Sequence, residues 1–163
     1  MLGKPQSGWT KITVGYKYLG TASYLDDVPM LCLETFLAYF TPSNIKREDG
    51  KVHIMNLPFS IVFDAEGYYF GIAEWNDTLY YIHDHTKNGD PVMDELVFED
   101  STNRVYDNLK LLAKECIKDI EENLEDWVRW IPEIEEYEDS EQIKFRRTLI
   151  KTKISVLEEF LKD

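Results

Sequence analysis

Acidic side chains are concentrated in residues 119–141, where they could bind a cationic partner. This stretch holds eleven carboxylates and one base, Arg129, in a chain whose formal net charge is −13. Solubility does not require such clustering, and repulsion between like charges destabilises a compact fold. Ten of these acids and two aromatic residues form the candidate partner-binding set: Asp119, Glu121, Glu122, Glu125, Asp126, Trp130, Glu133, Glu135, Glu136, Tyr137, Glu138 and Asp139.

Two rings, Trp130 and Tyr137, lie among these acids and could supply the buried contact of an interface. Charge speeds the encounter of two proteins, and a buried ring holds the complex together. Two interpretations stay open: a recognition surface for a basic protein, or a charged helix face and loop that only meet solvent. A calcium site is disfavoured because the stretch has no D-x-D-x-D-G loop.

The only cluster of histidines is His83-Asp84-His85. Side chains two residues apart on a strand share a face, as two metal ligands would. Zinc sites usually need three or four convergent ligands, and the chain has only 3 histidines. A strand that runs into a polar loop is the simpler interpretation, so we expect no metal and no cofactor. A small enzyme or metal-binding protein that uses His83 and His85 is the first alternative function.

Catalytic motifs are missing from the sequence: it has no G-x-S-x-G elbow, no Gly-rich phosphate loop, no H-E-x-x-H and no C-x-x-C. Asp26 and Asp27 directly precede a helix start, where an N-cap is a simpler role than a metal or catalytic pair. Cys32 and Cys116 lie in apolar helical patterns, which favours two reduced, buried thiols over a disulfide or a reactive thiol. We therefore expect a protein that is not an enzyme.

The composition is that of a folded globular protein, with 44% apolar and 13% aromatic residues. The negative net charge argues against nucleic acid and against an anionic membrane, because both need a positive face. The start of the chain lacks the apolar core of a signal peptide, and no run reaches the length of a membrane span. A cytoplasmic location is the expectation.

The acids must be positioned by an α+β domain. We expect a mobile leader at residues 1–8 and a single domain at 9–163, with a sheet and one helix in 9–98 and a helical part in 101–163. The predicted fold has an antiparallel sheet of about five strands, one buried helix in the N-terminal half and two or three C-terminal helices.

Turn signals separate the predicted strands. Trp9–Val14 and Tyr16–Tyr24 flank Gly15, which favours a first hairpin, and a buried helix follows from Asp26–Pro29 to about Phe40. A meander is predicted next: Phe59–Asp64, Tyr68–Trp75 and Thr78–His83, with a Gly67 turn between the first two. Residues 84–91 are expected to form a loop, and Val92–Phe98 a short strand or a loop.

The period becomes helical after Ser101. One helix is predicted from a cap at residues 101–103 to about Ile131, where Pro132 ends it. A last helix, Glu141–Leu161, carries two apolar stripes. It therefore lies in a groove between two elements, or leaves one stripe for another chain. The first stripe is Ile143, Ile150, Ile154, Leu157 and Leu161; the second is Phe145, Leu149, Val156 and Phe160.

Two stretches, GWTKITVG…SYLDDVP at Gly8–Gly15 and Ser23–Pro29 and FDAEGYYFGIAEW at Phe63–Trp75, resemble bacterial immunity proteins of contact-dependent or polymorphic toxin systems. The resemblance covers about half of the chain and rests on structural motifs, so it assigns no site residues. It implies a cytoplasmic inhibitor that blocks a cognate toxin domain, often a basic nuclease. Such a partner would suit the acidic stretch. A self-associating structural or adaptor protein, dimeric through the last helix, is the second alternative function.

Overall fold

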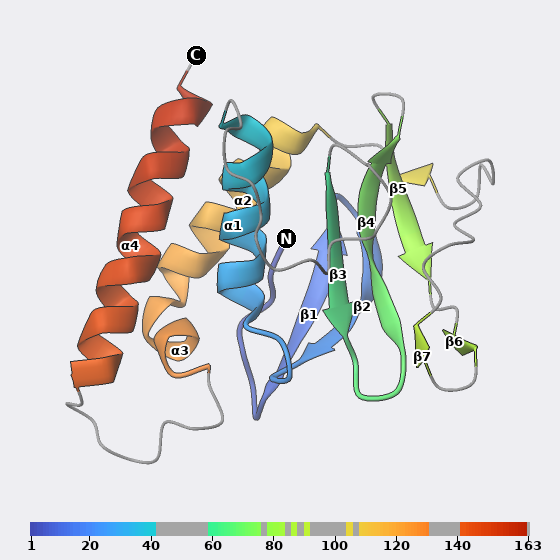
Figure 1. The fold of residues 1–163 in the computed structure, drawn as a ribbon, viewed down its shortest axis with the longest axis horizontal. Helices are drawn as coiled ribbons and strands as arrows, with labels where there is room; N and C mark the ends of the chain where they lie inside the picture. Colours follow the sequence, from blue (N-terminus) through green and yellow to red (C-terminus); the bar gives the residue numbers. More distant parts are fainter. Residues whose placement is uncertain are drawn as a thin grey trace.

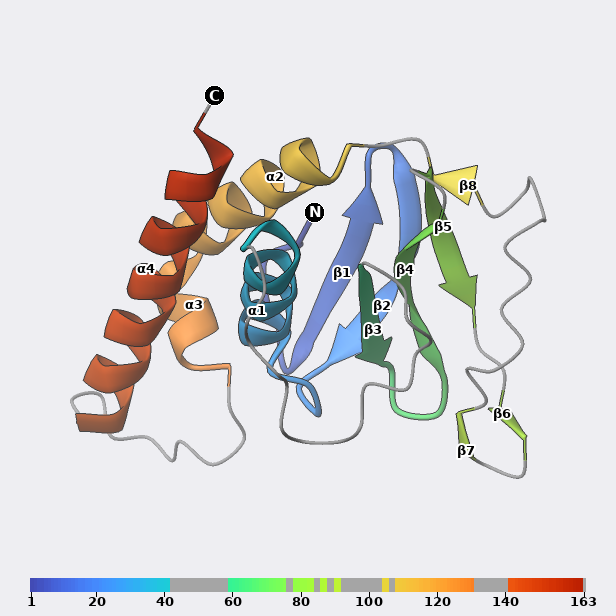
Figure 2. The same cartoon turned by 45° about the horizontal axis from the view of Figure 1, so that its top comes forward.

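The computed structural model describes residues 1–41, 59–75, 78–83, 86–87, 90–91, 104–105, 108–130 and 141–162. Within these residues the fold is α+β, with the helices gathered on one side of the strands (Figure 1). Helix α4 forms the outer edge, α1 and α2 lie next to it, and the sheets lie beyond them (Figures 1 and 2). The α+β prediction is therefore confirmed, while the arrangement of the strands differs in detail.

The first sheet is a hairpin of β1 (Trp9–Val14) and β2 (Lys17–Ser23). Its loop is Gly15-Tyr16, and Gly15 has a φ of 57°, a conformation that glycine adopts without strain. The predicted first hairpin is therefore confirmed. Strand β1 buries alternate residues, as expected when one face covers a core, whereas β2 buries the consecutive pairs Leu19-Gly20 and Ala22-Ser23.

The second sheet is antiparallel with the order β3-β4-β5-β8. These strands are β3 (Ser60–Asp64), β4 (Tyr69–Trp75), β5 (Thr78–His83) and β8 (Arg104–Val105). The predicted meander is confirmed, and Gly67 in its first turn has a φ of 130°. A short separate pair, β6 (Thr86–Lys87) and β7 (Asp90–Pro91), lies within residues 84–91, which were predicted to be only a loop.

The β1–β2 hairpin does not join the meander edge to edge, so the single sheet of about five strands is wrong in detail. The two sheets contact each other instead through side chains. The Tyr81 hydroxyl on β5 donates a hydrogen bond of 2.9 Å to the Leu19 carbonyl on β2. A Cβ at Gly20 would lie 2.8 Å from the Phe70 ring, so the absence of a side chain lets this ring pack closely on β2.

Helix α1 (Val28–Phe40) is the buried helix that the sequence predicts. Apolar residues occur on nearly all its sides, and Val28, Cys32, Leu33 and Phe36 are fully buried. Such a helix needs covering on more than one side, and α1 lies between α4 and the strands (Figure 1). Cys32 and Cys116 are both free and buried, as predicted.

The C-terminal helices are α2 (Leu109–Glu122), α3 (Leu124–Val128) and α4 (Glu141–Leu161). The prediction of one helix from a cap at 101–103 to Ile131 is wrong at both ends. Arg104–Val105 pairs with β5, and the side chain of Asn108 caps α2 instead. The helix is also interrupted at Asn123, before the predicted break at Pro132. Residues 92–103 and Pro132 themselves, like the strand or loop predicted at Val92–Phe98, lie outside the described residues.

The predicted boundaries of α4 are confirmed, and its two stripes have different surroundings. The first stripe is buried, whereas Phe145, Val156 and Phe160 of the second are 70%, 44% and 39% exposed. The groove interpretation for the second stripe is therefore wrong for these three residues. Among the described residues, no helix combines the length and the apolar character that crossing a bilayer requires.

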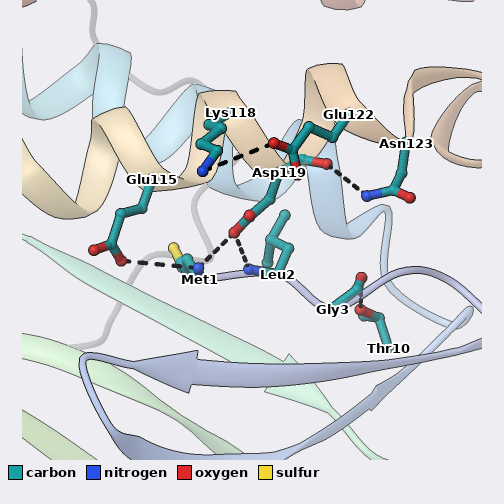
Figure 3. Close-up of polar contacts among 9 residues, drawn as sticks. All are labelled: Met1, Leu2, Gly3, Thr10, Glu115, Lys118, Asp119, Glu122 and Asn123. Atoms are coloured by element: carbon teal, nitrogen blue, oxygen red, sulfur yellow. Dashed lines mark hydrogen bonds and ion pairs between the residues drawn. The ribbon is translucent and has the colours of Figure 1, made fainter.

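Residues 1–3 are packed against the domain, whereas the mobile leader expected at residues 1–8 stays a prediction. Met1 and Leu2 are buried, the Gly3 amide donates to the Lys11 carbonyl, and Leu2 forms a bridge with Ile12. This segment lies between β1 and α2 (Figure 3). Burial of these two apolar side chains stabilises the packing. The sequence did not indicate it, because polar and glycine residues follow Met1 and Leu2.

Candidate functional site

The candidate site is built on the outer surface of α2 and α3. Asn108 starts α2 by accepting hydrogen bonds from the amides of Lys110 and Leu111 at 2.8 and 3.4 Å. The helix then buries one face, which includes Leu112, Cys116 and Ile120. Because apolar residues recur at helical spacing on that face, the acidic residues between them are turned toward solvent or toward the edges of the helix.

Asp119 is the least exposed of these acids, and it binds the start of the chain. Its Oδ2 accepts hydrogen bonds from the Met1 ammonium at 2.5 Å and from the Leu2 amide at 2.8 Å (Figure 3). Glu115 lies 3.9 Å from the same ammonium. Asp119 therefore stabilises the packing of the start of the chain, and its role in binding a partner stays a prediction.

Three further acids form ion pairs but stay exposed. Glu122 lies 3.7 Å from Lys118, and Asp126 lies 3.7 Å from Lys4. Glu125 accepts two hydrogen bonds from the Arg147 guanidinium on α4, at 2.8 and 2.7 Å. These hydrogen bonds hold the pKa of Glu125 below its ordinary value.

The exposed carboxylates of α2 and α3 are here called the acidic face: Glu121, Glu122, Glu125 and Asp126. Bases from other parts of the chain reduce its net charge, because Lys4 and Arg147 lie beside it in space. Exposed pairs of this kind contribute about 0–1 kcal/mol each, so their carboxylates can exchange partners at low cost. Five predicted acids and one ring lie outside the described residues: Glu133, Glu135, Glu136, Tyr137, Glu138 and Asp139.

Trp130 is part of the core, which corrects its prediction as an exposed anchor. It is 5% exposed, its ring centroid lies 5.2 Å from that of Trp127, and its Nε1 donates to the Asp26 carbonyl at 2.9 Å. The ring is amphipathic, and the partner for its N–H lies 104 residues away. Acidic neighbours in the sequence therefore do not show whether an aromatic ring is exposed, because residues distant in sequence can bury it.

A cleft of about 480 Å³ opens beside the acidic face. Ser7, Gly8 and Tyr24 line one wall, and Asp126, Arg129 and Trp130 line the other. The sequence contains no signal for this cleft, because its walls meet only when residues 1–8 pack near α3. Its lining combines a half-exposed ring, Tyr24, with one carboxylate, Asp126, and one base, Arg129.

Asp26 and Asp27 hold this region together but do not cap α1. Asp27 occupies the N-cap position without a side-chain cap hydrogen bond, so the predicted cap is wrong. Its carboxylate binds Arg146 instead. Asp26 accepts a hydrogen bond of 2.5 Å from the Asp64 amide, and burial raises the pKa of Asp26 despite this bond.

The histidine cluster receives no support from the described residues. Among them, no group of three or more His, Cys, Asp or Glu side chains could hold a metal ion. His83 ends β5, where only its backbone is described, and His85 lies outside the described residues. The use of His83 and His85 by an enzyme or metal protein stays an untested alternative.

Comparisons with protein-family models, with curated proteins and with solved structures gave no match for this chain. The function of this chain is therefore inferred from the geometry and charge of the acidic face.

Proposed function

We propose that this chain is a non-enzymatic binding protein, an immunity or inhibitor protein that occludes a basic toxin domain such as a nuclease. The observation that carries the proposal is the acidic face: four carboxylates on consecutive turns of α2 and α3, all exposed, in a chain of net charge −13. An acidic surface accelerates encounter with a basic protein and repels nucleic acid.

The cleft beside Asp126 supports the same proposal. Tight interfaces usually depend on a few side chains that fill pockets at the centre, surrounded by polar contacts. A lysine or arginine of the partner would enter between Tyr24 and Asp126, and its charge would compete with Lys4 for the carboxylate. Because the Lys4–Asp126 pair is 3.7 Å long and exposed, replacing it requires little free energy.

The test is co-expression of the chain with the large protein encoded directly upstream of its gene, with bacterial growth as the readout. We expect the upstream protein to be toxic alone and harmless together with the chain. An upstream protein without toxicity, or toxicity that the chain does not relieve, would show the proposal to be wrong.

The role of the acidic face is tested by reversing its charges. Glu121→Lys and Glu122→Lys, alone and combined, should slow association with the purified toxin domain at low salt by about tenfold or more. Glu66→Lys is the matched control, because Glu66 is exposed on the β3–β4 turn, away from α2. Equal effects of Glu122→Lys and Glu66→Lys would mean that the overall charge matters and the acidic face does not.

A further inference from the structure

The outer face of α4 carries an apolar stripe that is largely exposed. Phe145 is 70% exposed, and Val156 and Phe160 are 44% and 39% exposed, with half-buried Leu149 between them. Single exposed apolar residues are common, but four at helical spacing along one helix form a continuous patch. Helix α4 lies at the edge of the molecule (Figure 1), and the exposed fractions of these side chains show that the patch is accessible.

Polar residues next to the stripe are already satisfied within α4. The Thr148 hydroxyl donates to the Lys144 carbonyl at 3.0 Å, and the Thr152 hydroxyl donates to the Thr148 carbonyl at 2.9 Å. Each threonine can therefore present its methyl group outward without leaving its hydroxyl proton unpaired. Desolvation of this face therefore costs little free energy for polar groups. The threonine methyl groups extend the apolar surface beyond the four residues of the stripe.

The charges around the stripe limit what can cover it. Residues 142–157 contain five bases and no acid, which disfavours a basic partner. Four of these bases are nevertheless paired with acids, so the helix attracts an anionic partner only weakly. The pairs are Arg146–Asp27, Arg147–Glu125, Lys153–Glu34 and Lys144–Glu141.

The arrangement along α4 is complementary to itself. Phe145 and Phe160 are equally far from a point between Thr152 and Lys153, and Leu149 and Val156 are equally far from the same point. A twofold axis at this point in an antiparallel pair of helices would place Phe145 against Phe160 of the second copy. It would also place Leu149 against Val156 of the second copy, as a twofold interface requires.

The ends of the stripe fit the same orientation. An acid–base pair lies at each end, Glu141–Lys144 at the start of α4 and Glu159–Lys162 at its end. Antiparallel packing places Glu141 beside Lys162 of the second copy and Lys144 beside Glu159 of the second copy, so each acid lies near a base of the other chain. Parallel packing would instead place Lys144 beside Lys144 of the second copy, which is unfavourable.

We propose that the chain forms an antiparallel homodimer through the exposed stripe of α4. With 21 residues, α4 is about 31 Å long. A contact along one helix stays below the roughly 800 Å² per partner of a standard interface, so the dimer is weak and its population depends on concentration. The stripe shares no residue with the acidic face, so this inference does not depend on the proposed function.

Sedimentation velocity of the full chain tests the dimer between about 5 and about 500 µM, a range in which mass action should shift the population from monomer to dimer. Because each copy carries −13, raising NaCl from about 20 to about 300 mM should increase the dimer fraction by screening repulsion. A monomer at every concentration and salt would overturn the proposal.

Charge-swap variants test the orientation. Phe145→Glu alone and Phe160→Lys alone should each be monomeric, and an equal mixture of the two should recover the dimer because these positions face each other. Both side chains are exposed, so folding should persist, as circular dichroism will show. Leu111→Glu is the control, since Leu111 is an exposed apolar residue on α2 and should leave the dimer intact. Failure of the mixture to dimerise, or loss of the dimer in Leu111→Glu, would overturn the antiparallel α4 interface.

Discussion

Arg146 on α4 donates one hydrogen bond from each terminal guanidinium nitrogen to the two carboxylate oxygens of Asp27, both at 2.6 Å. The two residues are 119 positions apart, and their pairing fixes the start of α1 against α4. Arg146 is 8% exposed in its side chain, whereas Asp27 is 40% exposed. The second terminal nitrogen also contacts the Trp127 carbonyl at 3.4 Å, which orients the guanidinium.

This difference in exposure predicts unequal effects of removing each partner. Asp27→Ala leaves a buried guanidinium without its anion and should lower the free energy of unfolding by about 3–5 kcal/mol. Arg146→Met keeps the apolar volume and leaves a carboxylate that water can reach, so its effect should be smaller, about 1–2 kcal/mol. Urea unfolding measures both. An equal loss, or a larger loss for Arg146→Met, would contradict this account of the pair.

Asp119 should matter more for stability than its neighbour Glu122. Asp119→Ala removes the acceptor for the Met1 ammonium and the Leu2 amide, so we expect a loss of about 1–3 kcal/mol. Glu122→Ala breaks only the exposed pair with Lys118 and should change the free energy of unfolding by less than about 0.5 kcal/mol. Thermal or urea unfolding of the two variants gives the comparison, and similar values for both would refute the role assigned to Asp119.

Gly71 should tolerate no side chain. A Cβ at this position of β4 would lie 1.9 Å from the Ile61 carbonyl oxygen of β3, and backbone cannot move without breaking the strand pairing. Gly71→Ala should therefore lose about 3 kcal/mol or more. Gly20→Ala is the matched control, because its Cβ would meet only the Phe70 ring at 2.8 Å, and a ring can tilt at a cost of about 1–2 kcal/mol. The order of the two urea midpoints decides the matter.

Stability should fall at alkaline pH because of Cys32. Burial raises its pKa well above the ordinary value of 9.0, and the hydrogen bond with Cys116 raises the pKa further. The unfolded thiol therefore loses its proton first. The contribution of Cys32 is complete below about pH 9 and falls by up to about 1.4 kcal/mol per pH unit above it.

Urea unfolding of the wild type and of Cys32→Ala between pH 8 and 10 isolates this contribution. Burial raises the pKa of Tyr81 to about 12 from 10.0, so that group adds a dependence of the same sign mainly above this window. The variant should be less stable at pH 8 and should show a shallower decline. Parallel declines for the two proteins would exclude Cys32 as the cause.

Elements with local signals could be predicted from the sequence. The boundaries of α4 follow from its 3.6-residue period, α1 from Pro29 and its apolar composition, and the β3–β4 hairpin from Gly67. Each of these signals acts between near neighbours. A pattern of this kind is therefore visible without knowledge of the rest of the fold.

Features decided by distant contacts could not be predicted. Val105 continues the apolar period of α2, but pairing with Leu79 of β5 places it in a strand. Trp130 lies among acids in the sequence, but its ring is buried and its N–H donates a hydrogen bond to the Asp26 carbonyl. The sequence also shows two stripes on α4 without showing that only the first is fully buried, and it shows the charge of Asp119 without the ammonium that binds it.

Helix α1 faces a particular problem while the protein is being synthesised. Its apolar sides are complete when Phe40 has been added, yet Arg146 follows Asp27 by 119 residues. At a synthesis rate of about 5–20 residues per second, roughly 6–24 s pass before the last helix can cover α1. During that time α1 exposes an apolar surface to neighbouring chains, so production in cells should depend on chaperones that bind this surface. Truncation before α4 should yield aggregates.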